Sequence, residues 1–142
     1  MSALEDKDAI RELLAEYCFL LDSYRLKEFG RLFLDNGEWT SRNGGATGPA
    51  AIEAFMRQLV PEPGPGTGRK HFTANIIIRL NGDQAEVMSN FLVVRDTSAG
   101  PAIAVEGTYH DVVARDGANW RFKLRRLTHD IAGESGLKPV GT

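Results

Sequence analysis

Apolar residues recur every three or four positions in the first part of the chain, which predicts a helix with one buried face. This stripe consists of Ile10, Leu13, Leu14, Tyr17, Cys18 and Leu21. Upstream of it, Ser2 and Glu5 have the spacing of a capping box. The helix is therefore expected to begin near Ser2 and to end at about Asp22.

Asp22 lies at the edge of the predicted buried face, one residue past Leu21. A carboxylate in that position is costly unless a charged or hydrogen-bonding group meets it. One interpretation is that the helix forms the floor of a pocket, and that the side chains of Tyr17 and Asp22 both point into it. The alternative is that Asp22 caps the turn before the next helix, because Asp is common in turns.

Further elements are expected before residue 60: a helix over Leu26–Leu34 ended by Asn36-Gly37, a short strand over Glu38–Arg42, and a helix opened by Gly48-Pro49. The next segment, Pro61–Lys70, contains three Pro and three Gly. It cannot form a regular element. It is interpreted as a surface connector, or alternatively as a mobile flap over a pocket mouth.

After residue 70 the pattern becomes one of alternating strands. Strands are expected over residues 71–80, 84–95, 102–115 and 119–128, with tight turns at Asn81-Gly82 and Asp116-Gly117. Strict alternation puts His71 on the face opposite Ile76 and Ile78. It also puts Arg126, and not Arg125, on the face of Trp120 and Leu124.

Helices followed by antiparallel hairpins define the α+β class. We expect a curved sheet wrapped around the long first helix, which makes a cone with a cavity for a small molecule. The 142 residues suffice for one domain. This domain is expected over residues 1–132, followed by a loose tail over 133–142.

Charge and composition narrow the class of partner. The net charge is −2 with scattered Lys and Arg, which argues against nucleic acid. No apolar run approaches a membrane span, and the N-terminus lacks the order of a signal peptide, so a cytoplasmic location is expected. The single Cys18 excludes an internal disulfide and is interpreted as a buried core thiol.

His71 is the main candidate for chemistry, because it begins an apolar strand directly after the Pro/Gly segment. A His paired with a buried Asp is a common general base, and Asp22 is its best partner. The alternative is a surface or satisfied core histidine. Arg125 and Arg126 are adjacent on the last strand, so one of them is expected to face the concave side. The alternative is that both side chains reach solvent. An arginine on the concave side could stabilise a developing anion. No metal-binding spacing is found, so neither a metal nor another cofactor is expected.

Several short segments carry a resemblance to a known family: Tyr17 to Asp22, Leu32-Phe33-x-Asp35, Glu38-Trp39, His71-Phe-Thr-Ala-Asn75, Gly107-Thr-Tyr109-His-Asp111 and Trp120-Arg-Phe122. The chain to about Thr128 resembles the SnoaL-like branch of the nuclear transport factor 2-like superfamily. This resemblance implies a cone-shaped α+β barrel that forms a homodimer or homotrimer.

Scytalone dehydratase, the bile acid 7α-dehydratases and hexachlorocyclohexane dehydrochlorinase belong to this superfamily and use an Asp–His pair. The resemblance implies that Asp22 and His71 form that pair, with Tyr17 as a further catalytic residue. It also implies that Arg125 belongs to the active site, and that Trp39 and Tyr109 line the pocket.

The resulting hypothesis is a cofactor-independent lyase of the dehydratase type, acting on a small hydrophobic ring compound. His71 removes a proton, Asp22 orients His71, and Tyr17 polarises the carbonyl or helps the leaving hydroxyl. Trp39, Phe55, Tyr109 and Arg125 are expected to contact the substrate. The alternatives are an isomerase or polyketide-cyclase-like enzyme with the same pocket, and a non-catalytic binding or accessory subunit.

Overall fold

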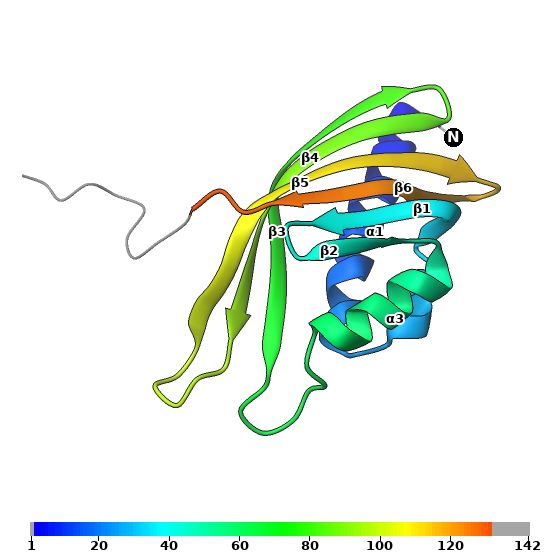
Figure 1. Ribbon diagram of the computed structural model, residues 1–142. Coiled ribbons are helices and arrows are strands. Elements are labelled where there is room, and N and C mark those ends of the chain that lie inside the picture. Colours follow the sequence, from blue (N-terminus) through cyan, green and yellow to red (C-terminus); the bar gives the residue numbers. More distant parts are fainter. Residues whose placement is uncertain (1, 132–142) are drawn as a thin grey trace, which may run out of the picture.

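A six-stranded curved sheet forms the body of the protein in this computed structural model, which describes residues 2–131 (Figure 1). The strands are arranged in the order β2-β1-β6-β5-β4-β3. Their bounds are β1 Phe33–Ser41, β2 Gly44–Thr47, β3 Arg69–Asn81, β4 Gln84–Arg95, β5 Ala102–Asp116 and β6 Asn119–Thr128. All neighbouring pairs are antiparallel except β1 and β6, which run parallel.

The helices are α1 Ala3–Asp22, α2 Leu26–Gly30 and α3 Pro49–Leu59. Figure 1 shows α1 lying along the concave side of the sheet, with α3 near β1 and β2. The α+β class and the curved sheet around a long first helix are therefore confirmed. The sheet does not close, because β2 and β3 are its two edges. The predicted loose tail over residues 133–142 lies outside the described residues.

Helix α1 forms as its sequence pattern predicts. The Ser2 hydroxyl accepts a hydrogen bond from the Glu5 backbone N–H, and the Glu5 carboxylate accepts one from the Ser2 backbone N–H. This reciprocal capping box satisfies two of the backbone donors that a helix start leaves free. The buried face contains every member of the predicted stripe and also Asp6.

The second helix is shorter than predicted, and the short strand begins earlier. The Leu32 carbonyl accepts a hydrogen bond from the Phe122 backbone N–H, and Phe33 is already paired with Phe122 in the sheet. Asn36-Gly37 therefore lies inside β1 and does not end a helix. Gly37 is needed for close approach, since a Cβ there would lie 2.6 Å from the Phe122 carbonyl oxygen.

A β-bulge in β3 reverses the predicted alternation of that strand. Asn75 has a positive φ of 57°, and the register with β4 shifts between Ala74 and Ile77. One extra residue on a strand turns all later side chains to the other face. His71 and Thr73 consequently share the concave face with Ile78, while Phe72 is exposed. The expectation that His71 lies opposite Ile78 is wrong for this reason.

A second bulge in β6 decides which arginine points inward. Val112 is paired with Leu124 but Val113 is paired with Phe122, so Lys123 is the extra residue. Beyond it the buried position moves by one residue, to Arg125, and Arg126 is exposed. Simple alternation gave the opposite assignment, whereas the family resemblance gave Arg125.

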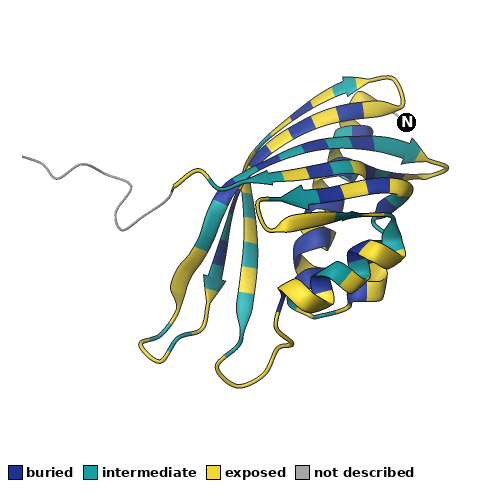
Figure 2. Ribbon diagram, in the orientation of Figure 1, coloured by how far each residue is buried: buried dark blue, intermediate teal, exposed yellow. Residues whose placement is uncertain are grey.

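Buried residues alternate with more exposed ones along the strands of the sheet (Figure 2), as expected when one face of a sheet packs against helices. Aromatic rings dominate the centre of the core, where Phe91 stacks on Tyr109 with ring centroids 4.3 Å apart. Tyr17 packs between Phe29, Tyr109 and Phe122. The interior of the cone is thus occupied by protein side chains around the middle of α1.

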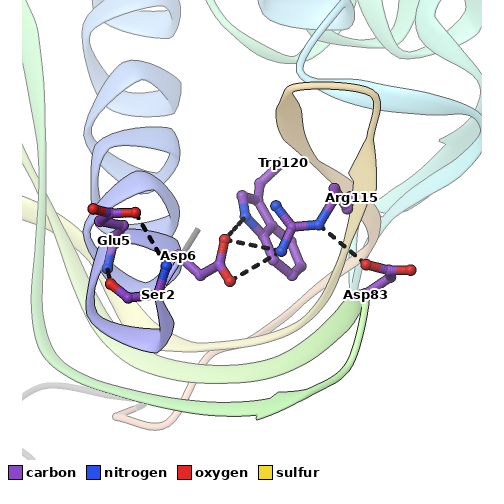
Figure 3. Close-up of polar contacts among 6 residues, drawn as sticks. All are labelled: Ser2, Glu5, Asp6, Asp83, Arg115 and Trp120. Atoms are coloured by element: carbon purple, nitrogen blue, oxygen red, sulfur yellow. Dashed lines mark hydrogen bonds and ion pairs between the residues drawn. The ribbon is translucent and has the colours of Figure 1, made fainter.

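At the start of α1 a buried carboxylate ties the helix to the sheet (Figure 3). Both oxygens of Asp6 accept hydrogen bonds of 2.9 Å from Arg115, and Trp120 Nε1 donates a third at 3.2 Å. Arg115 also binds Asp83 in the turn between β3 and β4. These contacts join the start of α1 to the β3–β4 and β5–β6 hairpins.

This cluster predicts a pH-dependent contribution to stability. Hydrogen bonding from Arg115 lowers the pKa of Asp6 below its ordinary value of 3.8, although desolvation opposes the shift. A carboxyl whose pKa is lower when folded stabilises the protein at pH above its ordinary pKa, and this stability is lost as pH falls through the folded pKa. Asp6→Asn is expected to lower the Tm at pH 7, and the difference from wild type should shrink below about pH 3.8.

Asp8→Asn is the matched control for that experiment, because Asp8 is exposed on the same helix. Thermal unfolding of the three proteins between pH 3 and pH 7, followed by circular dichroism, measures the effect. A Tm difference for Asp6→Asn that stays constant over this range would contradict the linkage.

Candidate functional site

Asp22 and His71 are in direct contact, although the chain separates them widely. Asp22 Oδ1 lies 2.5 Å from His71 Nδ1, and Asp22 Oδ2 accepts a hydrogen bond of 2.8 Å from the His71 backbone N–H. The His71 side chain is 10% exposed and that of Asp22 is 17% exposed. The carboxylate therefore holds both the ring and the backbone of His71.

Local structure explains why the two residues meet. Asp22 is the last residue of α1, while the C-cap position belongs to Ser23, whose backbone N–H bonds back to the helix. The alternative reading of Asp22 as a turn cap is thus wrong, because its side chain binds β3. His71 reaches the concave side because the bulge at Asn75 sets the face of this end of β3.

This geometry assigns different tasks to the two ring nitrogens. A carboxylate only accepts hydrogen bonds, so Nδ1 carries the ring proton and donates a hydrogen bond to Asp22. The lone pair of Nε2 is then free to accept a proton from another molecule. Asp22 also stabilises the imidazolium that forms when Nε2 is protonated. The pair therefore has the arrangement of an oriented general base.

The pair opens onto a groove between α1 and β3 with a volume of about 460 Å³. We call it the dyad groove. Its lining residues are Arg11, Leu14, Ala15, Cys18, Phe19, Asp22, Ser23, Arg69, Lys70, His71, Phe72, Thr73 and Ile76. Phe19 and Phe72 are 75% and 51% exposed, so two large rings stand at the solvent side of this groove. Its size suits a small ring compound.

Tyr17 lies elsewhere, in the packed interior, and does not line the dyad groove. Its hydroxyl oxygen accepts a hydrogen bond of 2.8 Å from Trp39 Nε1. Successive helical residues are rotated by about 100°, so five positions separate Tyr17 and Asp22 by roughly 140° around α1. The expectation that both look into one pocket does not hold, whereas Cys18 and Phe19 share the Asp22 side.

The other predicted contact residues also belong to the core. Trp39 and Tyr109 are buried, and the rings of Trp39 and Phe55 pack with centroids 5.5 Å apart. None of these three side chains lines the dyad groove. The family resemblance implied that Trp39 and Tyr109 line a pocket, but the interior they face is filled by other aromatic side chains.

Arg125 is completely buried in a charged pair with Asp111. Its Nε and Nη2 donate hydrogen bonds of 2.9 and 2.8 Å to the two Asp111 oxygens, and both side chains are 0% exposed. The rings of Tyr109, Tyr17 and Phe122 surround the guanidinium, with centroids 3.6, 4.2 and 4.5 Å from its carbon. Burial raises the pKa of Asp111, and the charge of Arg125 opposes that shift.

Two residues that sequence reasoning did not select lie beside the pair. Cys18 Sγ is 3.4 Å from Thr73 Oγ1, on the wall of the dyad groove. Burial raises the pKa of the Cys18 thiol, which keeps it protonated and weakly nucleophilic. Thr73 could have been selected as the residue two positions after His71, on the same face of the strand.

Two further observations concern only residues 2–131. No group of three or more His, Cys, Asp or Glu side chains in this part of the chain is placed to hold a metal ion. None of its helices combines the length and apolar character that crossing a membrane requires.

A curved sheet around a long first helix is the architecture of the nuclear transport factor 2-like class. Residues 2–126 match the SnoaL-like domain family, and the chain belongs to that family. The family resemblance predicted from the sequence is thereby confirmed. No curated protein matches the sequence.

Solved structures agree with this assignment. An NTF2-like protein with a cystatin-like fold from Novosphingobium aromaticivorans is 26% identical, with a TM-score of 0.81, and the match covers 93% of this chain and 86% of that one. A protein of the same species named "Putative Scytalone Dehydratase" is also 26% identical, with a TM-score of 0.77 and coverage of 98% and 95%.

A third similar structure is the β subunit of a ring-hydroxylating dioxygenase, named as putative, from the same species. It is 21% identical, with a TM-score of 0.75 and coverage of 95% of each chain, and this likeness concerns the fold alone.

Proposed function

We propose that this protein is a cofactor-independent lyase that removes water from a small hydroxylated ring compound, with His71 as general base. The contact between Asp22 and His71 at the dyad groove carries this proposal, because it orients a proton acceptor beside a largely apolar space. The similarity to a protein named as a scytalone dehydratase supports the same reaction class.

In the proposed reaction the substrate carries a proton on the carbon next to a carbonyl and a hydroxyl on the following carbon. His71 Nε2 takes that proton, and its electron pair forms the enolate. Collapse of the enolate makes the carbon–carbon double bond as the bond to the hydroxyl breaks. The imidazolium returns its proton to the leaving hydroxide, so the products are a conjugated ketone and water and His71 is regenerated.

The groove walls match such a substrate. Leu14, Cys18 and Ile76 provide apolar surface near the pair, and Phe19 and Phe72 can pack against the faces of a ring. We assign Tyr17, Trp39, Tyr109 and Arg125 to support of the fold around α1. The homodimer or homotrimer implied by the family resemblance stays a prediction.

The proposal is tested by incubating the protein with a panel of β-hydroxy ring ketones and following absorbance and product mass. Loss of one water, absent with His71→Ala, is the expected result. A product of unchanged mass would replace the proposal with an isomerase or cyclase that returns the proton to another carbon. No turnover of any panel member would favour a non-catalytic accessory role.

A further inference from the structure

The dyad groove is positively charged in a protein whose net charge is −2. Arg11, Arg69 and Lys70 line it, against the single carboxylate of Asp22. Both oxygens of that carboxylate are already bound to His71. The groove therefore contains three cationic side chains and no carboxylate that is free to pair with them.

Arg69 stands out among these cations, because part of its guanidinium is buried without a partner. Its Nε is buried and makes no hydrogen bond, and no ion pair within residues 2–131 includes Arg69. A buried N–H donor without an acceptor carries a free-energy cost, because its hydrogen bond to water is not replaced. Arg69 also lines the dyad groove, where a bound anion would meet its positive charge.

The surroundings of Arg69 add to this cost. Desolvation lowers the pKa of Arg69, the nearby charge of Arg95 lowers it further, and Asp22 partly opposes both. Arg69 and Arg95 also line a smaller neighbouring hollow together with Asp96. Among residues 2–131, Asp96 forms no ion pair with either arginine. An anion beside Arg69 would relieve the repulsion between the two arginines.

We propose that the dyad groove takes a ring compound carrying an anionic group such as a carboxylate, and that Arg69 is its anion contact. This inference deepens the proposed function, because it names the substrate class for the same site. The apolar ring then lies over Leu14 and Ile76, with its charged end toward the start of β3.

Strand geometry gives the spacing within that compound. Arg69 and His71 are two residues apart on β3 and both line the dyad groove. Alternate residues of a strand are roughly 7 Å apart, so we expect the anionic group and the reacting carbon to lie at different positions of the ring system. Compounds with the charge on the carbon next to the reacting one fit this spacing poorly.

Equilibrium binding of two naphthalene probes tests the inference without requiring turnover. The probes are 2-naphthoate and its neutral analogue 2-naphthamide, followed by their fluorescence. Wild type is expected to bind the carboxylate at least about tenfold more tightly, since a charge-assisted hydrogen bond is worth about 1.5–3 kcal/mol. Added salt should weaken only the carboxylate.

Arg69→Gln is expected to lower the affinity for 2-naphthoate about tenfold or more and to leave 2-naphthamide unchanged, with Arg69→Lys intermediate. The matched control is Arg126→Gln, which removes an exposed arginine on the other face of the sheet. Equal affinity for the two probes, no binding of either, or a preference that survives Arg69→Gln would overturn the inference.

His71→Ala separates this inference from the proposed function. The variant is expected to keep the carboxylate preference while it loses turnover. A wild-type protein that dehydrates neutral ring ketones without preferring 2-naphthoate would overturn only the anion contact. A clear Arg69-dependent preference without any turnover would overturn only the lyase.

Discussion

Replacing His71 with Ala is expected to lower kcat for a dehydrated substrate by about 10²–10⁴-fold, the usual contribution of a positioned general base. The variant removes Nε2, the only ring nitrogen that Asp22 leaves available. The fold should survive, since the side chain lies at the groove and not in the aromatic core. His110→Ala is the control, because His110 lies on β5 and does not line the dyad groove.

Asp22→Asn extends this prediction to the orientation of the base. The amide oxygen can still accept the His71 backbone N–H, but its NH₂ group then donates to Nδ1. The ring proton moves to Nε2, which is the nitrogen that must accept a proton. In Ser-His-Asp triads the same substitution lowers kcat about 10⁴-fold for this reason.

Steady-state kinetics of wild type, His71→Ala, Asp22→Asn and the surface control Asp8→Asn measure these effects. We expect KM to change less than kcat in both variants of the pair, because the pair acts on the reacting proton and not on the ring. Full turnover by His71→Ala would contradict the mechanism. Full turnover by Asp22→Asn alone would limit Asp22 to a structural role.

Asp111→Ala is expected to lower the free energy of unfolding by about 3–5 kcal/mol, because it leaves the Arg125 charge buried without its carboxylate. Both partners are fully buried, and two hydrogen bonds join them. The three surrounding rings still stabilise the Arg125 charge in the variant and reduce the loss, since each cation–π contact contributes about 0.5–2 kcal/mol. A domain is typically stable by only about 5–15 kcal/mol, so this loss is large.

Urea unfolding followed by fluorescence measures this change, with Glu28→Ala as control. Glu28 pairs with Arg25 in an exposed ion pair, which is expected to contribute about 0–1 kcal/mol. Replacing both partners, Asp111→Leu with Arg125→Met, should recover most of the lost stability, because an apolar pair has no charge to desolvate. If Asp111→Ala and Glu28→Ala cost the same, the buried pair does not stabilise the interior.

Much of the fold could be predicted from hydrophobic periodicity. The limits of α1 follow from a capping box and a continuous stripe, and β4 and β6 each begin just after a strong turn signal. The first part of β1 was not predicted because its pairing with β6 is long-range. No local sequence signal indicates that Phe33 joins a sheet. The bulges in β3 and β6 could not be predicted for the same reason, since alternation carries no signal for one extra residue.

For the candidate site, the sequence indicated the pair but not its surroundings. Asp22 is found as an acid at the edge of an apolar stripe, and His71 as a residue that follows an irregular segment. Spacing alone cannot show that Tyr17 turns toward Trp39, because the neighbours that fill the cone come from distant strands. Likewise, no sequence pattern shows that the Nε of Arg69 is buried without an acceptor among residues 2–131.

The bond from the His71 backbone to Asp22 has a consequence for solubility. Strand β3 is an edge of the sheet, and the unpaired N–H groups of an edge are a template for adding a strand from another molecule. Asp22 occupies one of these groups with a side chain, and Arg69, Lys70 and Arg79 place charges along the same strand. The carboxylate that holds the His71 ring therefore also protects the chain against edge-to-edge aggregation.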